Sequence, residues 1–214
     1  LKKLTSLRKR QRKNLKPAAG STNPLLDHVV VVQNRMDLAE RWLVEKNLQD
    51  VSLAGTFPPH DFGRQMETAA RFIAGGSAVP VIKCALGGFD THAGQMGRHR
   101  RLLTQLAEGL SSFARAMKGV GMWDDVLVMT YAEFGRRPRE NASSGTDHGT
   151  AAPQLILGGR VRGGFYGEQP PLDRLEGQNL VYRLDFRAIY ATVARRWWGL
   201  DGKFLGPRTL PLIT

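Results

Sequence analysis

Residues 79–92 read VPVIKCALGGFDTH, and this stretch decides the fold expected for the chain. Residues 79–86 are mostly apolar and end at two glycines, a pattern typical of a buried β-strand. The polar side chains of Asp90 and His92 follow at once, and a helical pattern resumes near Gln95. A strand that leads through a polar turn into a helix indicates an α/β protein, in which ligands bind at the carboxyl ends of the strands.

The same alternation continues along the rest of the chain. Apolar spacing predicts helices over 61–73, 95–118 and 185–198, the last of them capped by Asp185, and short buried strands at 125–131 and 154–157. Residues 25–48 have a helical pattern, with a short strand at 29–32 as the alternative. We therefore expect an α/β fold with a mainly parallel sheet flanked by helices.

Composition limits the class of protein. The 214 residues suffice for one substantial domain, and 42% hydrophobic with 23% charged residues excludes wholesale disorder. The single cysteine, Cys84, excludes a scaffold held by internal disulfides. No stretch reaches the roughly 18 consecutive apolar residues that a membrane span needs.

The net charge of +12 is concentrated at one end of the chain. Residues 1–16 contain eight basic residues and no acidic one, and a linker of small residues follows at 17–24. We expect residues 1–24 to form a basic arm and linker, and residues 25–214 to form the folded domain. Nucleic acid is the alternative partner of the arm, although no RNA-binding aromatic signature supports it.

Two Asp/His pairs are the candidates for metal binding. Asp90 and His92 follow the first predicted strand, and Asp147 with His148 lie between glycines in the aperiodic stretch 138–152. Carboxylate oxygen with imidazole nitrogen suits Zn²⁺ or Mn²⁺. Each pair alone also fits an ordinary polar turn, but two such pairs in a chain with five histidines favour a metal site.

A third polar cluster follows the predicted strand at 125–131. Glu133 is a candidate general base or further metal ligand, and Arg136 is a candidate clamp for a phosphate or sulfate oxyanion. The alternative is an Arg–Glu pair on the surface, which contributes little to stability.

These motifs together resemble a known bacterial family. The segments GGFDTH (87–92), EFGRR (133–137), GTDHGTA (145–151) and DFR (185–187) occur in the order seen in the domain-of-unknown-function 1501 family, and the likeness covers roughly residues 62–200. That family is grouped with the alkaline phosphatase/sulfatase superfamily, whose members are metal-dependent hydrolases of phosphate or sulfate esters. The resemblance implies an alkaline-phosphatase-like fold and a small-molecule phosphate or sulfate ester as substrate.

The resemblance also implies a ligand set. Asp90, His92, Asp147 and His148 would bind a divalent cation, with zinc, manganese and calcium as the candidates. Some members of the superfamily use a further, downstream histidine ligand, and no histidine follows His148, which leaves both a two-metal site and a one-metal, sulfatase-like arrangement open. Family members are about twice this length and carry their nucleophile in the amino-terminal half. Residues 1–60 contain no counterpart of that half. Family members often begin with a twin-arginine export signal, which implies the periplasm, and we find no such signal in this sequence.

We therefore expect a carboxyl-terminal portion of a metallohydrolase-like protein that is weakly active or inactive by itself. A non-catalytic binding or scaffold domain that retains the fold is the alternative.

Overall fold

The computed structural model describes residues 48–214, so the expected basic arm, the linker and the elements expected within 25–47 lie outside the described residues. The chain divides into two compact units, residues 1–50 and 51–214. In the first unit only the 3₁₀ helix η2 (Leu48–Asp50) is described. All that follows concerns the second unit. Within the described part, no helix is long and apolar enough to span a bilayer.

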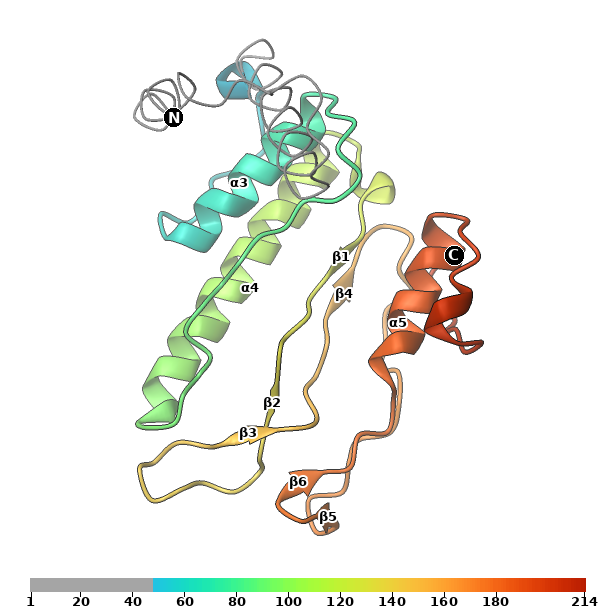
Figure 1. Cartoon of the computed structure of the whole chain (residues 1–214). Helices are drawn as coiled ribbons and strands as arrows, with labels where there is room; N and C mark the ends of the chain where they lie inside the picture. The colour runs from blue at the N-terminus through green and yellow to red at the C-terminus, as the bar shows by residue number, and fades with distance from the viewer. Residues whose placement is uncertain (1–47) are drawn as a thin grey trace, which may run out of the picture. The chain divides into compact units, whose positions relative to one another are not determined.

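Two long helices, α3 (Asp61–Ala74) and α4 (Gln95–Gly119), confirm the helices predicted from apolar spacing. They pack against each other over a shared apolar core (Figure 1). Gly109 of α4 has no side chain, which lets the Phe62 ring approach the helix closely. The nearest ring carbon lies 2.6 Å from the position that a Cβ atom of residue 109 would occupy. The buried core consists of Phe62, Met66, Ala69, Ala70, Leu110, Phe113, Ala116, Met117 and Val126.

The strand predicted at 79–86 is wrong. These residues run back along α4 as an extended segment without strand pairing (Figure 1). Val79 and Val81 are 47% and 61% exposed, and the Gln65 side chain binds both the N–H and the C=O of Ala85, at 2.8 and 2.9 Å. The sequence pattern reports a local preference for extended backbone, but a strand also needs a neighbouring strand. Within the described residues, the side-chain amide of Gln65 takes the place that a neighbouring strand would have.

The described strands form three antiparallel pairs, each strand two residues long. β1 (Val128–Met129) pairs with β4 (Ile156–Leu157). These two strands are short parts of the segments predicted as strands at 125–131 and 154–157. β2 (Gly135–Arg136) pairs with β3 (His148–Gly149), and β5 (Leu175–Glu176) pairs with β6 (Asn179–Leu180). No parallel pair occurs within residues 48–214, so the mainly parallel α/β sheet stays a prediction.

The carboxyl-terminal helix begins where the sequence predicts. Asp185 caps α5 (Phe186–Thr192) by accepting a hydrogen bond from the backbone N–H of Arg187, and a π-helical turn, η4 (Val193–Trp197), continues it. Two 3₁₀ helices complete the elements, η3 (Trp123–Asp125) after α4 and η5 (Lys203–Leu205) near the end. A second apolar core consists of Ala188, Ile189, Val193, Leu210, Leu212 and Ile213.

Candidate metal centre

The extended backbone at 90–92 presents the first Asp/His pair. Successive side chains of an extended chain point to opposite sides, so Asp90 and His92 share one side and Thr91 takes the other. Thr91 is 1% exposed, whereas the Asp90 and His92 side chains are about half exposed. The carbonyl of Thr91 accepts a hydrogen bond from the N–H of Thr146, at 3.2 Å, which begins to join this segment to the second pair.

The amino terminus of α4 holds the loop that carries the second pair. The N–H groups of Gly94 and Gln95 donate to the carbonyls of Ser143 and Ser144, at 3.0 and 2.8 Å, which satisfies donors that a helix leaves unpaired at its start. A Cβ atom on Gly145 would lie 2.2 Å from the carbonyl carbon of His92. Only glycine permits this approach, so the two loops come together because position 145 has no side chain.

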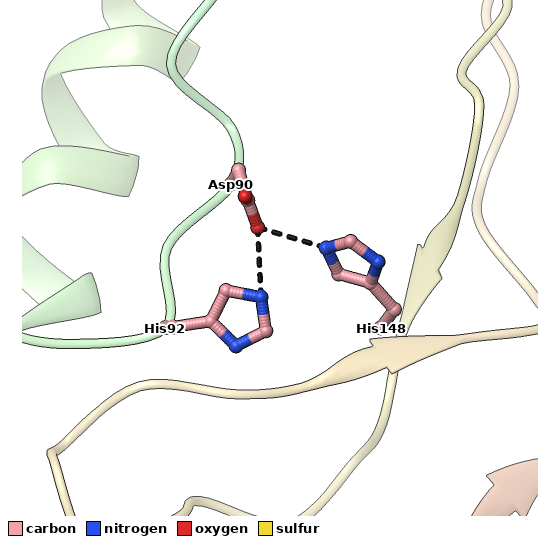
Figure 2. A group of neighbouring side chains, drawn as sticks. All are labelled: Asp90, His92 and His148. Carbon is pink, nitrogen blue, oxygen red and sulfur yellow. Dashed lines mark hydrogen bonds and ion pairs between the residues drawn. The ribbon is translucent and has the colours of Figure 1, made fainter.

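Three side chains from these two segments converge on one another (Figure 2). Asp90 Oδ1 lies 2.9 Å from His148 Nε2 and 3.0 Å from His92 Nε2. The three ligand atoms all lie within 4.8 Å of one another. The structure thus brings together residues that are 58 positions apart in sequence, as the two motifs predict, and leaves the cluster open to solvent.

Asp147, the fourth predicted ligand, contacts the same cluster from another side. Its Oδ1 lies 3.2 Å from Nδ1 of His92, the ring nitrogen that does not face Asp90. Its Oδ2 lies 3.5 Å from Nη1 of Arg137. Asp147 is therefore placed as the partner that orients the His92 ring and stands outside the group formed by Asp90, His92 and His148.

Arg136 links the two segments. Its guanidinium donates to the carbonyl of Thr146 at 2.6 Å, to the carbonyl of Phe89 and to Oδ1 of Asp90 at 3.0 Å. The side chain is only 17% exposed. Because protein acceptors take up these donors, the geometry makes Arg136 a brace for Asp90, and the predicted oxyanion clamp receives no support from it.

The structure does not bring Glu133 into the cluster. Its side chain is exposed and makes no hydrogen bond or ion pair with any residue in the 48–214 range. The neighbouring Phe134 does reach the site, because its ring stacks on the imidazole of His148 at 3.7 Å between centroids and 10° between planes.

Both carboxylates are stabilised in their charged form. The hydrogen bond from His148 holds the pKa of Asp90 below its usual value, with Arg136 and His92 acting in the same direction. The pKa of Asp147 is lowered by the hydrogen bond from Asn141 and then by that from His92. Each ionised carboxylate also has an arginine beside it, Arg136 for Asp90 and Arg137 for Asp147.

Sequence reasoning missed Asn141 and the role of Phe134. The motif around 133–137 contains Phe134, yet nothing in its spacing shows that the ring lies against a histidine. Asn141 stands in an aperiodic loop rich in small polar residues, where an asparagine is also the ordinary turn former. Only the folded loop distinguishes a turn residue from one that contacts the site.

The family expected from the four motifs is confirmed. The model of the family described as "Protein of unknown function (DUF1501)" matches residues 16–203, and the chain belongs to that family. No curated protein and no solved structure matches the sequence.

Proposed function

We propose that this chain is the metal-binding part of a metal-dependent hydrolase of phosphate or sulfate esters. The convergence of Asp90, His92 and His148 carries the proposal. The resemblance of the motifs to the alkaline phosphatase/sulfatase superfamily supports the reaction class and an alkaline-phosphatase-like fold.

The spacing of the three ligand atoms fits a single cation. Two ligands held about 2.1 Å from one ion at a tetrahedral angle lie about 3.4 Å apart. Asp90 Oδ1 lies 2.9 and 3.0 Å from the two Nε2 atoms, so the side chains would have to move apart by about 0.4–0.5 Å to reach that value around an ion. Small rotations of exposed side chains would complete the geometry, since neither histidine is held by close packing on all sides.

The surroundings of His92 also favour a cation. Both of its ring nitrogens face carboxylate oxygens, Nε2 toward Asp90 at 3.0 Å and Nδ1 toward Asp147 at 3.2 Å. A neutral imidazole has one N–H and a carboxylate only accepts hydrogen bonds, so one of the two contacts requires a second proton or a cation. A cation beside Nε2 leaves Nδ1–H to donate to Asp147, the arrangement found around metal-bound histidines.

The donor set narrows the choice of metal. Two imidazole nitrogens and one carboxylate oxygen suit zinc or another transition ion, whereas calcium takes six to eight oxygen ligands. Of the three candidates, we propose zinc or manganese. Three protein ligands leave a coordination position for water or substrate, which distinguishes catalytic from structural zinc sites.

The residues of this chain would hold the ion and keep it accessible. A bound divalent ion would polarise the ester oxygen and stabilise the charge of the departing group. Arg136 would fix Asp90, Asp147 would fix His92, and Phe134 would fix the plane of the His148 ring. The solvent exposure of the three ligands leaves a phosphate or sulfate group free to approach.

The test is titration of the purified chain with Zn²⁺ and Mn²⁺, followed by calorimetry and by elemental analysis after dialysis. We expect one ion per chain, and a loss of at least 10-fold in affinity in Asp90→Asn and in His148→Gln. Asp173→Asn is the matched control, because Asp173 is exposed and lies outside the cluster. Equal metal content in all variants would reject the site.

The same samples address the scaffold alternative. Hydrolysis of p-nitrophenyl phosphate or sulfate by the metal-loaded protein, lost in His148→Gln, would support the hydrolase. Stoichiometric metal without turnover in a longer version that includes the family's amino-terminal half would favour a non-catalytic binding domain.

A further inference from the structure

We infer that Asn141 is a positioning residue of the metal centre, which holds Asp147 so that His92 turns its Nε2 atom toward the ion. The inference rests on the proposed metal site. It adds a residue from the loop between β2 and β3 that touches none of the three candidate ligand atoms.

The Asn141 amide uses its full hydrogen-bonding capacity. Its Nδ2 donates to the carbonyl of His92 at 3.1 Å and to Oδ1 of Asp147 at 3.2 Å. Its Oδ1 accepts from the N–H groups of Ser143 and Gly145, at 3.0 and 3.1 Å. An amide offers two donors and two acceptor positions, so every one of them is occupied.

This saturation fixes which way the amide faces. The oxygen faces two N–H donors, and the nitrogen faces a carbonyl and a carboxylate, so a flipped amide would oppose like groups at all four contacts. The backbone N–H of Asn141 also donates to the carbonyl of Gly145 at 2.8 Å, which closes the loop around the side chain. Asn141 is half-buried, and both its backbone N–H and its side-chain amide are hydrogen-bonded.

These hydrogen bonds determine how the His92 ring is oriented. Oδ1 of Asp147 accepts from Asn141 and faces Nδ1 of His92 at the same distance of 3.2 Å, so one amide holds both the carboxylate and the backbone of the histidine it orients. When an ion is bound to the lone pair of His92 Nε2, the proton of the ring lies on Nδ1 and the Asp147 carboxylate accepts it.

Asn141→Asp separates this role from loop folding. A carboxylate has the shape of the amide and still accepts from Ser143 and Gly145, but it replaces the Nδ2 donor with an oxygen that faces Asp147 and the His92 carbonyl. We expect the Zn²⁺ dissociation constant to rise 10- to 100-fold, the range for groups that orient metal-bound histidines. Gln169→Glu is the control for the added charge, because Gln169 is exposed and has no hydrogen bond within residues 48–214.

A second readout reports the orientation of His92 directly. NMR of the zinc-loaded protein with ¹⁵N-labelled histidine shows whether Nδ1 of His92 carries a hydrogen-bonded proton. We expect a protected Nδ1–H in the wild type and its loss in Asn141→Asp. If the wild type binds no ion, the proposed function fails; if it binds one ion and Asn141→Asp keeps both the affinity and the Nδ1–H, only the role of Asn141 fails.

The double variant Asn141→Asp/Asp147→Asn protects the test against simple misfolding. It restores a donor–acceptor pair between positions 141 and 147 at equal net charge, whereas Asn141→Asp alone opposes two carboxylates. Because Asn141 acts through Asp147, we expect the double variant to lose no more Zn²⁺ affinity than Asp147→Asn alone. An unchanged dissociation constant and an unchanged Nδ1–H in Asn141→Asp would overturn the inference, as would a double variant that shows the summed losses of the two single variants.

Discussion

The α3–α4 helix pair and the Asp/His cluster are held together by opposite means. The helices meet through buried apolar side chains, with Ala116 and Met117 of α4 fully buried. The cluster meets through hydrogen bonds between loops, with its candidate ligands exposed. Apolar burial is non-directional and depends on area, whereas the polar contacts depend on the position of individual atoms.

The difference teaches that stability and site geometry are separable in this molecule. Substitutions in the helical core should change the free energy of unfolding and leave metal affinity in the folded protein unchanged. Substitutions of the exposed ligand side chains should do the reverse, and a substitution that pushes the two loops apart should change both. Four experiments test or sharpen this contrast.

The largest effect is expected for Met117→Ala. Met117 has no exposed surface and lies in the α3–α4 core, so its truncation leaves a cavity and lowers the free energy of unfolding by about 2–5 kcal/mol. Urea unfolding measures the loss, with Met96→Ala as the control because Met96 is 78% exposed. A weakened Zn²⁺ affinity in the folded Met117→Ala protein would contradict the separation.

Gly145→Ala should act on both properties. The added Cβ atom meets the backbone of His92 at about 2.2 Å, and one of the two loops must move. We expect about 1–3 kcal/mol of destabilisation and a Zn²⁺ dissociation constant at least 10-fold higher. Gly87→Ala is the control, since nothing lies within 4 Å of its added atom. Equal affinities of the two variants would show that loop contact does not set the site geometry.

His60→Ala should produce a smaller loss confined to the helix pair. His60 Nδ1 accepts from the N–H of Gly63 at 3.0 Å and caps α3. Removing a cap costs about 1 kcal/mol. Thermal unfolding measures the change, and His60→Asn, which restores an accepting side chain, should recover most of it. Failure of His60→Asn to do better than His60→Ala would argue against the capping role.

The smallest effect concerns the pH dependence of α5. Arg187 lowers the pKa of Asp185 from 3.8 to about 2 through side-chain and backbone hydrogen bonds. A lowered folded-state pKa stabilises the protein above the unfolded-state pKa, and this contribution is lost as the pH falls from about 4 through about 2. The difference in unfolding midpoint between wild type and Asp185→Asn should therefore be constant from pH 7 to 5 and decrease steadily from about pH 4 to about pH 2. A constant difference down to pH 2 would contradict the assignment.

Local signals predicted the helices well. The apolar stripe over 61–73 and the glycines at 75 and 76 define α3 almost to the residue, and Asp185 marks the start of α5. These features predict structure because helix hydrogen bonds are local and the caps lie within one turn of the residues they satisfy. The prediction of a strand at 79–86 is wrong because strand pairing is not local. A mostly apolar run of residues does not show whether a partner strand lies beside it.

The sequence by itself determined the identity of the chemical groups. It supplied the two Asp/His pairs, the glycine at position 145 and the family to which the chain belongs. Tertiary structure alone decided their roles, because roles depend on distances of about 3 Å between segments some 50 residues apart. It placed Asp147 behind His92, used Arg136 as a brace, left Glu133 outside and brought in Asn141. A motif shows which chemical groups the chain contains. Only the packing of the loops on α4 shows which of these groups are in contact.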